Sequence, residues 1–219
     1  MPSETLAPGE IGWYGKLPAA GDFLRHHLPD AFVDDWDAWL RAGMAAAADA
    51  QGEDWQDSFL RFPVWYFLRG NDGSGAWAGL LLPGVDRVGR LFPMTVAFNI
   101  PPDDFGGLAF AQIETRLAAI EDHTLAVLGD DDLERFEEAL AALQPLQPEP
   151  QDTSATSATP AALVETLGKQ ALYASLAERA VFWSSVHAAE KFLHALPEPL
   201  QADSFCKLVL PAPIPILSE

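Results

Sequence analysis

The alternation of apolar and polar positions predicts several short strands along the chain. Residues 11–14 are apolar, β-branched and aromatic, which is typical of a short buried strand. The runs at 63–69, 76–82 and 94–100 have similar composition and are joined by short segments rich in Gly and Pro. Adjacent strands with such short links predict an antiparallel meander. A late aromatic run at 180–186 predicts one more strand.

Apolar residues recur at helical spacing in three other segments. Residues 30–50 carry one apolar face, and Asp30 is placed to cap the start of this helix. That face consists of Phe32, Trp36, Trp39, Leu40, Gly43 and Ala47. Residues 110–129 and 130–143 predict two further helices, the second beginning with acidic residues that favour a helix N-terminus. We interpret the aromatic stripe as core, because periodic apolar faces normally pack inward.

Two segments show no periodicity. Residues 1–10 are polar and contain proline, which predicts a loose N-terminus. Residues 144–160 are rich in Pro, Ser and Thr, which predicts a mobile linker on the surface. Because the residues beyond this linker are too few to fold alone, we predict that 11–219 form a single α/β domain.

Composition narrows the functional classes. The chain has 219 residues and a formal net charge of −19 at neutral pH, so we expect neither nucleic-acid binding nor attraction to an anionic membrane surface. Cys206 is the only cysteine, which excludes an intramolecular disulfide and suits a reducing compartment. The sequence shows neither a secretory signal nor an apolar run long enough to cross a bilayer. We therefore expect a cytoplasmic protein without direct membrane insertion.

Two glycine-rich stretches hold the candidate chemistry. They read G-W-Y-G-K-L-P-A-A-G-D-F at 12–23 and G-V-D-R-V-G-R-L-F-P at 84–93. Both follow strand-like runs, and Gly and Pro make both loops stiff, so we predict that they meet at one end of the sheet. Their charged residues, with Arg25 just after the first stretch, form the candidate partner-binding surface: Lys16, Asp22, Arg25, Asp86, Arg87 and Arg90.

Two interpretations of these charges remain open. The cations could contact a partner, since arginine presents a rigid fork suited to carboxylate or phosphate. They could instead form a purely structural network in which Asp22 and Asp86 neutralise them.

Signatures of catalysis are absent from the sequence. The adjacent His26 and His27 point apart, the other histidines lack ligand spacing, and neither glycine-rich stretch matches a known phosphate-binding loop. We therefore predict no metal, no cofactor and no enzymatic activity. The alternative is a hydrolase that uses Asp22 or Asp86 with His26.

The two glycine-rich stretches, with P-V-W-Y-F at 63–67 and V-F-W-S at 181–184, resemble the TagF (ImpM) family of accessory proteins of the bacterial type VI secretion system. Tyr66 stands where the family pattern P-x-W-R-F has a basic residue. The resemblance implies an α/β fold of the α+β kind, with a largely antiparallel central sheet flanked by helices. It also implies a cytoplasmic, post-translational repressor of secretion-system assembly whose partner is a forkhead-associated scaffold protein. Nothing in the chain resembles the phosphatase domain to which some members are fused.

Overall fold

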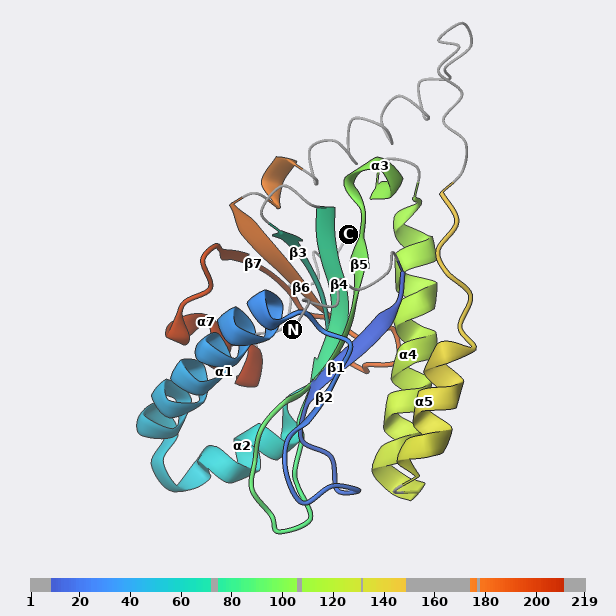
Figure 1. Cartoon of the computed structure of the whole chain (residues 1–219). Helices are drawn as coiled ribbons and strands as arrows, with labels where there is room; N and C mark the ends of the chain where they lie inside the picture. Colours follow the sequence, from blue (N-terminus) through green and yellow to red (C-terminus); the bar gives the residue numbers. More distant parts are fainter. Residues whose placement is uncertain are drawn as a thin grey trace, which may run out of the picture.

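An antiparallel sheet of seven strands lies between two groups of helices (Figure 1). The computed structural model describes residues 9–71, 75–105, 108–130, 132–148, 174–176 and 178–210. The strands are β1 (Ile11–Gly15), β2 (Leu24–His26), β3 (Trp65–Asn71), β4 (Gly75–Leu82), β5 (Met94–Ile100), β6 (Arg179–Ser184) and β7 (Leu193–Pro197). Their order is β2-β1-β5-β4-β3-β6-β7, and every neighbouring pair is antiparallel. The predicted meander is therefore confirmed as β3-β4-β5, and the α+β fold class is confirmed with it.

The helices divide between the two faces of the sheet. They are α1 (Asp30–Gln51), α2 (Trp55–Arg61), α3 (Pro102–Phe105), α4 (Phe110–Asp130), α5 (Leu133–Ala141) and α7 (Ala202–Val209), with a short 3-10 turn at Gly52–Asp54. One face is covered by α1, α2 and α7, and the other by α4 and α5 (Figure 1). This arrangement makes a single domain with one apolar core on each side of the sheet.

The central strands are buried on both faces, which explains why they read as continuous apolar runs. Along β3, Trp65 and Phe67 belong to the core beneath α1 and α7. The alternate residues Tyr66 and Leu68 belong to the core beneath α4. All four side chains are fully buried. Successive residues of this strand therefore point to opposite faces, and each packs in one core or the other.

The long helix α1 buries the predicted stripe and lacks the predicted cap. All six residues of the stripe are buried, and the indole Nε1 of Trp36 donates to Thr95 Oγ1 on β5 at 2.9 Å. Pro29 occupies the N-cap position without a side-chain hydrogen bond, so the prediction that Asp30 caps the helix was wrong. Asp30 lies instead in the first helical turn and pairs with the guanidinium of Arg25.

Three further segments differ from the predictions or fall outside what the structure describes. The short strand β2 and the helix α3 were not predicted. Residues 144–148, the start of the predicted linker, lie against α4, where Leu146 is half-buried. The rest of that linker, 149–160, and most of the predicted loose terminus, 1–8, lie outside the described residues. Within the described ranges, no helix has the length and apolarity needed to cross a membrane.

Candidate functional site

The two glycine-rich loops meet at one end of the sheet, as predicted. Because β1 and β5 are antiparallel neighbours, the loop after Gly15 and the loop before Met94 leave the sheet at the same end. A Cβ at Gly84 would lie 2.3 Å from the carbonyl oxygen of Phe92 and 2.6 Å from that of Lys16. Only glycine therefore fits where the loops touch.

Asp86 joins the two loops through its carboxylate. Its Oδ1 accepts backbone N–H groups from Val88 at 3.1 Å and from Arg90 at 2.8 Å. Its Oδ2 accepts Lys16 Nζ at 2.9 Å and Arg90 Nε at 2.6 Å. The side chain of Asp86 is fully buried and that of Lys16 is only 5% exposed, so this ion pair is shielded from water.

The contacts of Asp86 fix its charge. Burial alone would raise the pKa of its carboxyl, but the backbone N–H of Arg90, the side chains of Lys16 and Arg90 and the N–H of Val88 outweigh burial and hold the pKa well below the usual range. A carboxylate with so low a pKa is a weak base. Asp86 is thus suited to holding the loops together and poorly suited to accepting a proton.

Arg87 and Arg90 present their guanidinium groups to solvent. Arg87 Nη2 donates to the carbonyl of Ala19, and Arg90 Nη2 donates to that of Gly21, each at 2.7 Å. Arg90 is also 3.8 Å from the carboxylate of Asp22, and both of these side chains are more than half exposed. The backbone of one loop therefore positions the arginines of the other.

The structure brings together five of the six predicted site residues and leaves Arg25 out. Arg25 lies on β2, where its Nη2 donates to Leu28 O at 2.9 Å and its guanidinium pairs with Asp30. Those contacts direct the Arg25 guanidinium toward the start of α1. Its inclusion in the loop cluster was therefore wrong.

The site also contains a cation that the sequence interpretation missed. Arg41 of α1 lies over the rings of Phe23 and Phe92, with distances of 5.2 and 5.4 Å from its guanidinium carbon to the ring centroids. Asp37 accepts Arg41 Nε at 2.6 Å and the hydroxyl of Tyr14 at 2.5 Å. Burial, reinforced by Asp37, raises the pKa of Tyr14 to about 12. In the sequence, Asp37 and Arg41 form only an i,i+4 pair on a polar helix face. The tertiary structure was needed to show that Arg41 lies beside the two loops.

We call the exposed part of this region the charged loop surface. It comprises the exposed residues Asp22, Arg41, Arg87, Val88 and Arg90, with the half-buried ring of Phe23 beside them. With the groups that contact them, its cations are Lys16, Arg41, Arg87 and Arg90 and its carboxylates are Asp22, Asp37 and Asp86, which leaves one positive charge in excess in a chain whose net charge is −19. Val88 is 70% exposed at its tip. The surface therefore combines fixed cations with apolar contact area.

The pair required by the hydrolase alternative is not in contact. His26 stacks on Trp13 with ring centroids 4.0 Å apart, and burial is the main cause that lowers its pKa. In the described part of the chain, no hydrogen bond or ion pair joins His26 to Asp22 or Asp86. No group of three or more His, Cys, Asp or Glu side chains is placed there to ligate a metal ion either.

Fold and loops together define an α+β protein with a charged, partly apolar surface at one end of its sheet. Residues 12–143 match the family model described as the TagF N-terminal domain, type VI secretion system-associated. The chain belongs to this family and is a type VI secretion-associated protein, which confirms the resemblance drawn from the two loops.

A solved structure extends the similarity over nearly the whole chain. The crystal structure of PA0076 from Pseudomonas aeruginosa PAO1 is 31% identical in sequence and superposes with a TM-score of 0.74. The match covers 95% of this chain and 98% of that one. Comparison with curated protein sequences found no match.

Proposed function

We propose that this protein is a cytoplasmic, non-enzymatic regulator that represses type VI secretion-system assembly after translation. It does so by binding a forkhead-associated scaffold protein through the charged loop surface. Family membership supports the link to the secretion system. The observation that carries the binding role is the fixed, outward placement of Arg87 and Arg90 by the carbonyls of Ala19 and Gly21.

Preorganisation makes this surface suited to recognition. Ordering a long side chain at an interface costs about 0.5–1.5 kcal/mol, and less of that cost remains where hydrogen bonds already hold the side chain. The backbone carbonyls restrict Arg87 and Arg90 before a partner arrives, while their remaining N–H groups stay free to contact acidic or carbonyl groups. The buried pair of Lys16 and Asp86 provides a rigid base beneath them.

Replacing both exposed arginines should separate binding from folding. We expect Arg87→Ala with Arg90→Ala to weaken scaffold binding by about 30-fold or more, on the scale of interface hot spots. The free energy of unfolding should fall by about 1.5–3 kcal/mol, because Arg90 also donates to the buried carboxylate of Asp86, which keeps Lys16 and two backbone N–H donors. Calorimetric titration with the purified scaffold and urea unfolding of the same variant measure the two effects.

Arg61→Ala is the matched control for this experiment. Arg61 is 78% exposed and pairs with Asp57 within α2, outside the charged loop surface. The Arg61→Ala change should leave both the scaffold affinity and the free energy of unfolding unchanged. Unchanged affinity in the double variant would refute the proposed surface. A loss of several kcal/mol in stability from Arg87→Ala alone, whose guanidinium contacts the carbonyl of Ala19, would favour a purely structural network.

The non-enzymatic part of the proposal has its own test. We expect hydrolase and phosphatase substrate panels to show no turnover above a heat-treated sample, because Asp86 is held as a weak base and His26 stacks on Trp13. Saturable activity that co-purifies with the protein and disappears in Asp22→Asn would instead support the hydrolase alternative.

A further inference from the structure

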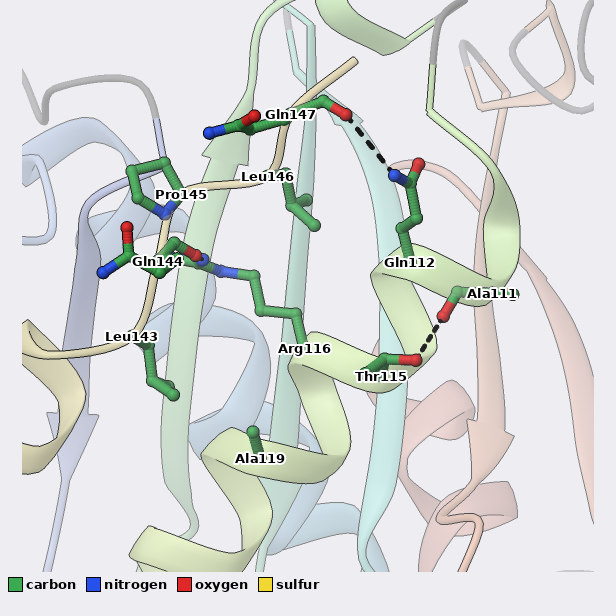
Figure 2. Close-up of a pocket in the computed structure, with 10 residues that line it drawn as sticks. All are labelled: Ala111, Gln112, Thr115, Arg116, Ala119, Leu143, Gln144, Pro145, Leu146 and Gln147. Carbon is green, nitrogen blue, oxygen red and sulfur yellow. Dashed lines mark hydrogen bonds between the residues drawn. The ribbon is translucent and has the colours of Figure 1, made fainter. Parts of the chain in front are cut away.

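A groove of about 540 Å³ lies along α4, away from the charged loop surface. Figure 2 shows it between the helix and the segment 143–147, which runs beside it. Its walls are mainly apolar and include Ala111, Ala119, Leu143 and Leu146. Its volume lies within the range of about 300–1,000 Å³ that is typical of small-molecule sites.

One buried cation extends across this groove. Arg116 is 7% exposed, and its side chain extends from α4 toward the facing segment (Figure 2). Its guanidinium donates to the carbonyl of Gln144 and, at 2.6 Å, to that of Gly9, and lies 4.9 Å from the ring centroid of Phe98. Its Nε–H is buried and has no acceptor.

The charge of Arg116 is not neutralised by a carboxylate among the described residues. Its guanidinium contacts two backbone carbonyls and an aromatic ring, and burial lowers its pKa. A buried cation is unfavourable unless an anion approaches it. A carboxylate placed beside the guanidinium would supply the missing charge.

Two polar side chains of α4 that line the groove already have hydrogen-bond partners. The hydroxyl of Thr115 donates to the carbonyl of Ala111 at 2.8 Å. The amide of Gln112 accepts the N–H of Ala109 at 2.8 Å and reaches the carbonyl of Gln147 at 3.4 Å. Among the residues that line the groove, Arg116 is the one cation. The groove therefore has a single positive charge, set among apolar walls and the side-chain amides of Gln144 and Gln147.

We propose that this groove binds a small amphipathic carboxylate. The carboxylate contacts the Arg116 guanidinium, and the apolar body lies along α4 between Ala119 and Leu146. The negative charge of the whole protein does not forbid this, because exposed charges beyond about 8 Å are screened at physiological ionic strength. The role of Arg116 in holding Gly9 and Gln144 is compatible with the site, since each terminal nitrogen carries a second N–H.

Calorimetric titration with decanoate, below its micelle concentration, tests the proposal on the full chain. We expect saturable binding of decanoate and at least tenfold weaker binding of decylamine, whose charge is opposite. Arg116→Gln should lower decanoate affinity by about tenfold or more, the scale of a charge-assisted hydrogen bond. Arg61→Gln, which removes an exposed arginine elsewhere, should leave the affinity unchanged.

A second variant guards against structural damage, because Arg116 also holds two backbone segments. Ala119→Phe fills the groove and leaves Arg116 in place, so it should abolish decanoate binding while thermal stability stays near that of the unchanged protein. Three results would overturn the proposal: no saturable binding of decanoate, groove variants that bind decanoate as tightly as the unchanged protein does, or decylamine binding as tightly as decanoate. Binding that appears only after residues 149–160 are deleted would also overturn it, and would assign the groove to the chain's own segment.

Discussion

Lys16→Met is expected to lower the free energy of unfolding by about 3–5 kcal/mol, the usual effect of removing one partner from a buried ion pair. Methionine keeps the length of the lysine stem, so the change chiefly removes the ammonium group that contacts Asp86 at 2.9 Å. Asp86 then stays buried with Arg90 as its one remaining side-chain cation. Urea unfolding at pH 7 measures the loss, which corresponds to a decrease in Tm of about 6–20 °C for a domain of this size.

Lys207→Met provides the matched control, since Lys207 is about half exposed and pairs with Asp203 one helical turn away. This change should alter stability by less than about 0.5 kcal/mol. An equally small effect of Lys16→Met would contradict the structural role of the buried pair.

The effect of Lys16→Met should also depend on pH. The folded-state pKa of Asp86 is depressed, because its hydrogen-bond and ion-pair donors outweigh burial. A depressed carboxyl pKa stabilises the folded state above the unfolded pKa of about 4, and this contribution is lost as pH falls toward the folded value. The difference in stability between the two proteins should therefore be constant from pH 5 to 7 and shrink in more acidic solution. A difference that grows on acidification would contradict this assignment.

The sequence predicted the fold where periodicity was strong. The stripe on α1 is long and aromatic, so tertiary packing agreed with the local signal. The strand Leu24–His26 was missed because three residues, two of them polar or charged, give too short a pattern. It forms because its backbone pairs with β1, and that is a tertiary effect.

The site was predictable as two loops and not as a set of contacts. Gly15, Gly84 and the preceding strands indicated where the chain turns, and antiparallel pairing then brought the loops together. Arg25 was misassigned because sequence proximity to Asp22 says nothing about the side to which a strand directs its side chain. Arg41 was missed for the converse reason, because it reaches the loops from a helix that packs over them.

The departure from the family pattern at Tyr66 also has a structural explanation. The Tyr66 hydroxyl donates to Glu121 Oε2 at 2.6 Å, and Ser185 Oγ donates to the same oxygen at 2.5 Å. Glu121 is 3% exposed, so the tyrosine supplies a donor to a buried carboxylate where the pattern has a cation. Burial, followed by the bond to Glu121, raises the pKa of Tyr66 far above neutrality, so the hydroxyl remains a donor. Glu121 was not predicted, because one acidic residue on a helix usually faces solvent.

Tyr66→Phe is expected to lower the free energy of unfolding by about 2–3 kcal/mol, the scale of a hydrogen bond to a charged group. The change leaves the ring in place and removes one of the two hydroxyl donors to Glu121 Oε2. In a Glu121→Leu background the same change should cost less than about 1 kcal/mol, because the charged acceptor is gone. Urea unfolding of the two single variants and the double variant gives the coupling energy directly.

A variant with the basic residue of the family pattern extends this test. Tyr66→Arg places a guanidinium opposite Glu121, where it forms a charge-assisted pair. We therefore expect it to be more stable than Tyr66→Phe when Glu121 is present and less stable than Tyr66→Phe when Glu121 is replaced by leucine, since the buried cation then has no partner. A coupling energy near zero between positions 66 and 121, or the same stability order in both backgrounds, would show that Tyr66 is retained for its ring alone.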